Sequence, residues 1–526
     1  MKPTQVLAAI CLLCSALALS IQTDADVRLP NIFGSNMVLQ QEMPLRFFGW
    51  ADPGEKVSVE CLGQSAETVA DENGNWRVEL PGRLADGNTF HVKIKGKNEI
   101  DLNNCLLGEV WICSGQSNME WSVARSAKPQ EEINAANYPE IRLFNVPRHV
   151  TSNRPENNVA GNWQECTPQT VTDFSAVGYH FGRELFRETE IPIGLIGSNW
   201  GGTRIEPWTP KHGFDSVEQL DNISRHLEKI DPTTDAGKKY HNQYLAQVED
   251  WVQQARKDVE AGKLPGAPPT KNDFQPVSNA TTIYNAMVHG MAPFSVRGVI
   301  WYQGESNAGD GLRYQHLKKG LVNGWRETFE NPELSFYWVQ LAGFQQPDDN
   351  PAGSGWGPVR EGQRRAMEIP NTGMAVTIDI GQANDIHPRN KQDVGKRLSR
   401  WALRDHYGQS DLVPSGPLYK SMKAGDGKIV ISFEHVGDGL MTGKKSGMDP
   451  VVPTNESELT QFAIAGADQQ WKWAQAKIEG DTVVVWHDEI SEPAAVRYSY
   501  QSNPVGANLY NKNGLPASPF KTDDWN

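Results

Sequence analysis

Residues 110–119 read Val-Trp-Ile-Cys-Ser-Gly-Gln-Ser-Asn-Met, an apolar run that passes into small and polar residues. Four successive apolar residues, Val110–Cys113, indicate a strand that is buried on both faces, and Gly115 marks the turn that ends it. Ser117 follows that turn, at a position where a helix can begin. A buried strand followed by a polar turn and a helix is typical of a parallel α/β sheet.

The same order recurs along the middle of the chain. Apolar runs alternate there with helix-like segments at Ser175–Glu190, Leu312–Phe329 and Lys391–His406. We therefore predict an α/β fold with a three-layer α/β/α core, in which helices cover both faces of a mostly parallel sheet. The further runs are Ile141–Val146, Ile193–Ile196, Val296–Tyr302, Ser335–Leu341 and Met374–Ile380.

The regions that flank this core have a different pattern. Residues 26–105 show period-two alternation between Gly-containing turns, which predicts an N-terminal β-sandwich. The core is predicted over 106–410, with a polar helical insertion at about 211–275. Alternating segments return over 411–526 and predict a C-terminal β-domain. A chain of 526 residues is long enough for two or three such domains.

The N-terminus predicts export. Lys2 precedes an apolar run from Val6 to Leu19, and small residues follow, so residues 1–25 have the layout of a signal peptide. The protein is then secreted or periplasmic. We predict no membrane span further along the chain.

Composition excludes several classes of partner. The net charge of −14 argues against nucleic acid or an anionic membrane as the main partner. Four cysteines follow the leader, at spacings that suggest no metal site, and we expect either buried thiols or a single disulfide. No bound metal or cofactor is predicted, and the sequence makes no prediction of oligomeric state.

Four polar clusters follow four of the buried runs. Because ligands bind at the carboxyl ends of parallel strands, we expect these clusters to converge on one site. They are Gly115-Gln116-Ser117-Asn118-Met119, Asn199-Trp200-Gly201-Gly202-Thr203-Arg204, Gln303-Gly304-Glu305-Ser306-Asn307 and Asn384-Asp385-Ile386-His387-Pro388.

These clusters contain the parts of a serine hydrolase. Ser117 needs a base to become nucleophilic, His387 can serve as that base, and Asp385 can orient the imidazole. Backbone N–H groups of Ser117 and Gly202 can stabilise an oxyanion. The side-chain amide of Gln303 or Asn307 is expected as a third donor. A serine here can also be a simple helix cap, and Asp385 can cap the helix that follows Pro388.

At these residues the sequence resembles the sialate O-acetylesterase family of SGNH hydrolases. Gly115–Met119 looks like the nucleophile block, and Asp385–Pro388 looks like the histidine block. The resemblance implies a serine mechanism and an acetylated carbohydrate substrate. The general SGNH pattern places the acid three residues before the histidine, where this chain has Asn384, so Asp379 and Glu305 are alternatives to Asp385.

We therefore predict a carbohydrate esterase that removes O-acetyl groups from sialic acid or from a plant or algal polysaccharide. The alternatives are a carbohydrate-binding protein with an inactive esterase domain and an esterase for other acyl esters. The substrate is expected to contact Gln116, Trp200, Arg204 and Glu305, and Arg204 is placed to meet a substrate anion.

Overall fold

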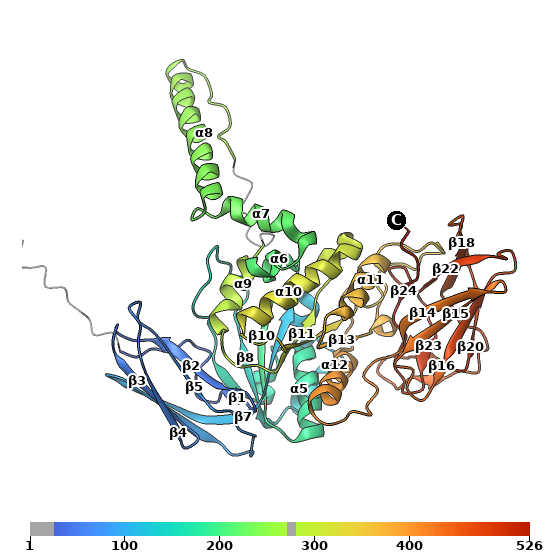
Figure 1. Cartoon of the computed structure of the whole chain (residues 1–526), viewed down its shortest axis with the longest axis horizontal. Coiled ribbons are helices and arrows are strands. Elements are labelled where there is room, and N and C mark those ends of the chain that lie inside the picture. Colours follow the sequence, from blue (N-terminus) through green and yellow to red (C-terminus); the bar gives the residue numbers. More distant parts are fainter. Residues whose placement is uncertain (1–25, 271–279, 526) are drawn as a thin grey trace, which may run out of the picture.

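The computed structural model describes residues 26–270 and 280–525, and strand β7 (Glu99–Gly115) organises the N-terminal half of it. The first part of β7 pairs with an antiparallel strand, and its last part lies in the parallel core sheet (Figure 1). The division predicted between residues 105 and 106 therefore falls inside a strand that both regions share.

The core sheet has the order β13-β12-β11-β7-β10-β8-β9. Every neighbouring pair from β13 to β8 is parallel, and only the edge strand β9 is antiparallel to its neighbour β8. The bounds are β8 (Tyr138–Asn145), β9 (Trp163–Cys166), β10 (Ile193–Asn199), β11 (Gly298–Tyr302), β12 (Ser335–Val339) and β13 (Thr372–Ala375).

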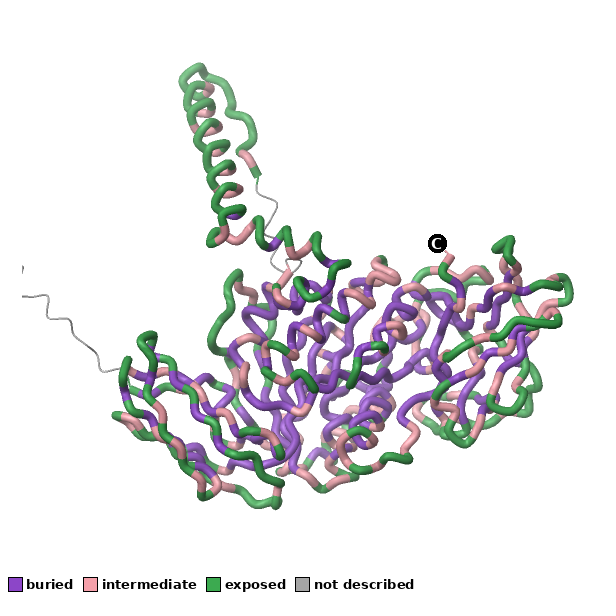
Figure 2. The backbone as a smooth tube through the Cα atoms, viewed as in Figure 1, coloured by how far each residue is buried: buried purple, intermediate pink, exposed green. Residues whose placement is uncertain are grey.

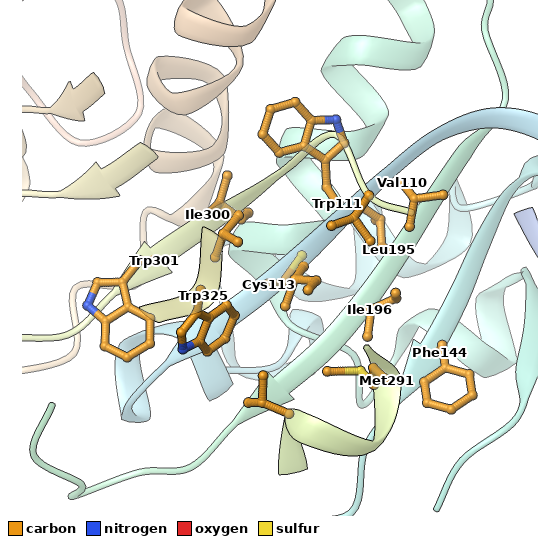
Figure 3. Packing of buried hydrophobic residues seen from close by; sticks show 14 of the residues in the cluster. Val110, Trp111, Cys113, Phe144, Leu195, Ile196, Met291, Ile300, Trp301 and Trp325 are labelled. Atoms are coloured by element: carbon orange, nitrogen blue, oxygen red, sulfur yellow. The ribbon is translucent and has the colours of Figure 1, made fainter. Parts of the chain in front are cut away.

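Helices cover both faces of this sheet. On one face, Trp111 of β7 meets Phe181 of helix α5 (Ala176–Thr189) with ring centroids 5.0 Å apart. On the other face, Trp301 of β11 meets Trp325 of helix α10 (Tyr314–Thr328) at 6.4 Å (Figure 3). Helix α12 (Lys391–His406) packs beside α5, and α11 (Gly357–Arg365) beside α10. Strands that are apolar on both faces require this double cover.

One apolar run does not form the strand that its composition suggests. Met374–Ile380 was predicted as a buried strand, but β13 ends at Ala375 and a short 3₁₀ turn follows at Ile378–Ile380. Asp379 in that turn pairs with Arg397 of α12 through contacts of 2.6 and 2.8 Å. The Asp379 carboxylate therefore lies in a turn, where it pairs with Arg397, and not in the apolar sheet.

The N-terminal region contains strands joined by turns and loops, and no helix, over its described residues 26–98. One sheet contains β3, β4, β6 and the first part of β7, and β2 pairs with β5. Burial alternates along β5 because Trp76, Val78 and Leu80 face inward. The bounds are β1 (Val38–Gln40), β2 (Leu45–Trp50), β3 (Lys56–Cys61), β4 (Gln64–Val69), β5 (Asn75–Leu80) and β6 (Phe90–Lys95).

The insertion predicted at 211–275 is mainly helical up to Glu260, and its described residues 261–270 form no helix or strand. It contains α6 (Lys211–Asp215), α7 (Asp221–Ile230) and α8 (Asp235–Glu260). Helix α8 extends away from the rest of the molecule, and most of its surface is exposed (Figures 1 and 2). Its polar composition accounts for this exposure.

The C-terminal region is built from strands around a second apolar core. Ile431, Val483, Phe462, Tyr498 and Phe520 are among the buried members of that core. The strands of this region are β14 (Leu418–Gly425), β15 (Lys428–Glu434), β16 (Leu440–Lys444), β17 (Val452–Pro453), β18 (Phe462–Gly466), β19 (Lys472–Trp473), β20 (Gln475–Glu479), β21 (Thr482–Trp486), β22 (Pro493–Tyr498), β23 (Leu509–Asn511) and β24 (Phe520–Lys521). The prediction of an α/β core with a large sheet and additional β-sheet regions is confirmed.

Two further expectations concern the ends and the cysteines. The predicted signal peptide, residues 1–25, lies outside the described residues. In the described part of the chain, no helix has the length and apolar character needed to cross a membrane. The cysteines of the described residues are buried free thiols, namely Cys61, Cys105, Cys113 and Cys166.

Candidate active site

Three of the four polar clusters meet because of the strand register. Gly115 at the end of β7 lies opposite Asn199 of β10 on one side and Tyr302 of β11 on the other. Gly115 has φ 136°, and a Cβ there would lie 2.2 Å from the Tyr302 carbonyl oxygen. Only glycine therefore lets the chain turn at this point. The ends of these three strands therefore lie together, as expected.

The fourth cluster completes the site with a histidine. Ser117 is the first residue of the short helix α2 (Ser117–Glu120). His387 lies in the loop before α12, and its Nε2 is 2.9 Å from the Ser117 Oγ. This distance is within reach of proton transfer from the hydroxyl to the imidazole. The two residues are 270 positions apart in sequence and are brought together by the fold.

The Trp121 indole packs against one face of the His387 imidazole. The Trp121 ring stacks on the His387 ring, with centroids 4.5 Å apart and an interplanar angle of 16°. The Trp121 Nε1 donates to the Arg125 carbonyl oxygen at 2.8 Å, which fixes the indole. The rotamer of His387 is thereby restricted on one face by a rigid ring.

Asp385 is the candidate acid that lies beside His387. Its Oδ1 is 3.6 Å from the His387 Nδ1, which is longer than a hydrogen bond. The same oxygen accepts the backbone N–H of His387 at 2.9 Å. The two alternatives have other partners: Asp379 pairs with Arg397, and Glu305 Oε1 accepts from Asn118 Nδ2 at 2.5 Å.

Two backbone donors are available for an oxyanion. Among the described residues, no hydrogen bond uses the N–H of Ser117 or of Gly202. The neighbouring Gly201 N–H donates instead to Glu120 Oε2. A Cβ on Gly201 would lie 3.2 Å from the Ser117 Cβ, so the glycine turn passes directly beside the serine.

The amides of Gln303 and Asn307 are used elsewhere, contrary to their expected role as donors. Asn307 Nδ2 donates to Glu206 at 3.0 Å and to Asp310 at 2.8 Å, so both of its hydrogens are taken. Gln303 Nε2 donates to the Thr203 carbonyl oxygen at 3.2 Å and to Asn307 Oδ1 at 2.6 Å. As arranged, these buried amides brace the turn that carries Gly202.

Arg204 is not a free cation, although the sequence suggested it as the anion-binding residue. Its guanidinium contacts Glu206 at 2.6 Å and Asp310 at 2.7 Å, so two carboxylates offset its charge. Arg125 differs from it: its guanidinium lies 3.7 Å from the Trp121 ring centroid, and no ion pair involves it among the described residues. Arg125 is therefore an exposed cation in contact with the Trp121–His387 stack.

Two more of the residues expected to contact the substrate, Gln116 and Trp200, are mostly enclosed, and the Glu305 Oε2 is enclosed as well. Gln116 is 3% exposed, and its Oε1 accepts the Ser306 N–H at 3.2 Å. Trp200 is 7% exposed, and its ring meets His149 edge-on at 4.9 Å. Both side chains pack against the turns around Ser117 and present little open surface.

Comparisons with known proteins identify the family of the chain. A family model described as carbohydrate esterase, sialic acid-specific acetylesterase, matches residues 107–268 and 270–404. The chain belongs to this family. Sialate O-acetylesterase from Mus musculus is 27% identical over 94% of this chain and 94% of its own length. The human protein of the same name is 28% identical over 74% of this chain and 73% of its own.

A solved structure supports the family assignment. A carbohydrate acetylesterase from Xanthomonas citri is 34% identical and superposes with a TM-score of 0.76, covering 95% of this chain and all of that one. The protein described here is accordingly a carboxylic ester hydrolase, as the sequence predicted.

The charges around His387 favour the neutral imidazole in this acetylesterase. Burial lowers the pKa of His387, Lys391 and Arg125 lower it further, and Asp385 acts in the opposite direction. A neutral imidazole is the form that can accept the serine proton. His387 therefore stays neutral to lower pH than a free imidazole does.

Sequence reasoning missed the polar groups beneath the site. Asn118 contacts Glu305, the Ile386 carbonyl oxygen and Lys391, and none of these contacts was anticipated. Lys391 opens the helix α12, where a lysine is usually exposed, yet its exposed fraction is 0%. The only available signal was its position four residues after His387.

Proposed function

We propose that the protein is an SGNH-type serine esterase that removes O-acetyl groups from carbohydrate through an acetyl-enzyme. The observation that carries the proposal is the 2.9 Å contact between Ser117 Oγ and His387 Nε2 at the carboxyl ends of the core strands. Family membership and the acetylesterase relatives supply the ester class. Two free N–H groups beside the serine supply the remaining requirement for acyl transfer.

The first half of the reaction transfers acetyl to the serine. Ser117 Oγ attacks the acetyl carbonyl carbon while His387 Nε2 accepts the hydroxyl proton. The resulting oxyanion accepts hydrogen bonds from the N–H groups of Ser117 and Gly202. The carbon–oxygen bond to the sugar then breaks, and the imidazolium returns its proton to the sugar oxygen, which leaves as a hydroxyl.

The second half releases acetate. Water attacks the acetyl-Ser117 carbonyl carbon, and His387 accepts a proton from that water. Collapse of the second tetrahedral intermediate breaks the bond to Oγ and returns the proton to the serine. Asp385 stabilises the imidazolium in both halves, because its carboxylate lies 3.6 Å from Nδ1. Neither half requires a metal or a cofactor.

The substrate class in this proposal is an acetylated sugar, either a sialic acid or a plant or algal polysaccharide. The His387 ring, 23% exposed, is the part of the Trp121–His387 stack that a sugar can reach, because the Trp121 ring is only 8% exposed and the Arg125 guanidinium lies over it. Arg125 is the group that an acidic sugar would meet, since Arg204 is neutralised. Hydrolysis of a panel of acetylated acidic and neutral sugars distinguishes the two classes.

The proposal includes export and a division of the chain. Residues 1–25 form a cleaved signal peptide, so the enzyme acts outside the cytoplasm or in the periplasm. Residues 26–105 and 411–526 are flanking β-domains, and 106–410 is the catalytic domain. N-terminal sequencing of the protein recovered from its native host tests the cleavage.

The decisive experiment replaces the nucleophile. Ser117→Ala should lower kcat for p-nitrophenyl acetate by about 10³-fold or more, with an unchanged melting temperature. Ser114→Ala is the matched control, because Ser114 lies on β7 three residues before Ser117 and its hydroxyl has no hydrogen-bond partner among the described residues. Near-normal turnover by Ser117→Ala would overturn the proposal. Failure of the wild-type enzyme on every acyl ester would favour a carbohydrate-binding protein.

A further inference from the structure

One amide side chain joins the nucleophile helix to the histidine loop. Asn118 follows Ser117, and its Nδ2 donates to the Ile386 carbonyl oxygen at 3.0 Å and to Glu305 Oε1 at 2.5 Å. Its Oδ1 accepts from Lys391 Nζ. The orientation of the amide is unambiguous, because an ammonium can only donate and a peptide carbonyl can only accept. Ile386 is the residue before His387, so this amide fixes the base relative to the nucleophile.

Lys391 places a buried amine at the base of the site. The residue is 0% exposed, and its Nζ lies 5.2 Å from the Tyr302 ring centroid and 6.0 Å from the Trp121 ring centroid. Trp121 is the ring that stacks on His387. Burial lowers the pKa of Lys391 to about 7, and Glu305 and Asp385 act in the opposite direction. The amine is therefore protonated on the acidic side of neutrality.

Among the described residues, Glu305 is the one anion that the Asn118 amide contacts. Its Oε2 is enclosed and has no hydrogen-bond partner among the described residues, and burial raises its pKa. An enclosed carboxylate needs a nearby cation or several donors to remain charged. Lys391, reached through the Asn118 amide, is the cation that acts on it.

We propose that Asn118, Glu305 and Lys391 are positioning residues that hold the His387 loop against helix α2, and that the Lys391 ammonium sets the acidic limit of the reaction. The proposal rests on the serine mechanism given above. The charged groups that act on His387 are Lys391 from α12, Arg125 from the turn after α2 and Asp385 from its own loop. Only Lys391 combines complete burial with a hydrogen bond into the nucleophile helix.

The two roles predict two different kinetic effects. Lys391 opposes a second positive charge on His387, so the imidazole stays neutral to lower pH than it otherwise would. Replacing Lys391 by an uncharged residue then lets His387 take up its proton at higher pH. Losing the Asn118 amide frees the Ile386 carbonyl and misplaces the base, which lowers kcat while leaving substrate affinity unchanged.

The test compares pH profiles of kcat/KM. In Lys391→Met the acidic limb should move to higher pH by about one unit, so that activity relative to wild type falls about 10-fold more at pH 5.5 than at pH 8.5. Lys445→Met is the matched control. Lys445 is also buried and pairs with Asp393 of α12 at 2.6 Å, but it does not act on His387. The acidic limb of the Lys445→Met profile should stay at the wild-type position.

A second variant separates position from charge. Asn118→Ala should lower kcat by about 10- to 10²-fold with KM within two-fold of wild type and no upward shift of the acidic limb. An unshifted limb in folded Lys391→Met, or wild-type kcat in Asn118→Ala, would overturn the inference. If Lys391→Met does not fold, the Asn118→Ala kcat decides alone. An inactive Ser117→Ala alongside either result shows that the proposed function still holds.

Discussion

Asp385→Asn probes how strongly the acid supports the base. The Asn side chain keeps an oxygen that can accept the His387 backbone N–H, now accepted by Asp385 Oδ1 at 2.9 Å, so the loop should hold its shape. The change removes the negative charge 3.6 Å from Nδ1. The variant therefore measures the electrostatic contribution of the carboxylate to the imidazolium that forms during acyl transfer.

The expected loss follows from that distance. Opposite unit charges 3.6 Å apart attract by about 1 kcal/mol at the dielectric constant of water and about 5 kcal/mol at an effective value of 20. The His387 and Asp385 side chains are 23% and 36% exposed, so water weakens the attraction. We expect kcat to fall by about 10- to 10²-fold, less than the roughly 10⁴-fold typical of a tightly bonded triad acid.

Stopped-flow or steady-state hydrolysis of p-nitrophenyl acetate measures this loss, with the melting temperature recorded in parallel. Because the carboxylate favours protonated His387, its removal should also move the acidic limb of the pH profile to lower pH, opposite to Lys391→Met. Asp385→Ala is the comparison that removes the loop contact as well. A kcat within two-fold of wild type would leave a Ser–His dyad, and a 10⁴-fold loss would mean that the 3.6 Å contact shortens during reaction.

Three more outcomes test other parts of the structure. Burial holds the pKa of Lys318 far below its ordinary value, so unfolding takes up a proton and the stability of the fold should rise with pH toward about 10.4. Lys318→Met should therefore raise the melting temperature at pH 7 and remove this pH dependence of stability. The control Lys319→Met, at an exposed site, should do neither. Arg125→Ala should raise KM for an O-acetylated sialic acid about 3- to 10-fold more than for an acetylated neutral sugar, and equal effects on both would exclude Arg125 as a carboxylate contact. Activity should survive EDTA, and a loss that zinc or calcium restores would contradict the proposed chemistry.

The α/β core was predictable because its strands and helices have distinct hydrophobic periods. Helix α12 runs over Lys391–His406, the range that the sequence predicts, because its apolar stripe is regular from end to end. The junction near residue 105 was not predictable. Strand β7 continues from Glu99 to Gly115, and a local pattern does not record which neighbour a strand pairs with along its length.

The proximity of Ser117 and His387 was predictable, because few residue types can act together as nucleophile and base. A serine and a histidine placed after buried strands have a specific joint meaning, and their atoms lie 2.9 Å apart. The amide donors were not predictable in this way. Gln303 and Asn307 can each donate two hydrogens to any nearby acceptor, and the acceptors that they use come from the distant residues Thr203, Glu206 and Asp310.

The charge balance at His387 explains why a sequence can name the base but not its working pH. Asp385, two residues away, favours the imidazolium, whereas Lys391 and Arg125 oppose it from two other elements. Asp385 is partly exposed, so water reduces its effect, while Lys391 is fully enclosed and acts at lower effective dielectric. The cations therefore outweigh the adjacent carboxylate, and with burial they lower the pKa of His387 even though it has an acid beside it. A motif of serine, histidine and aspartate alone would imply the opposite direction.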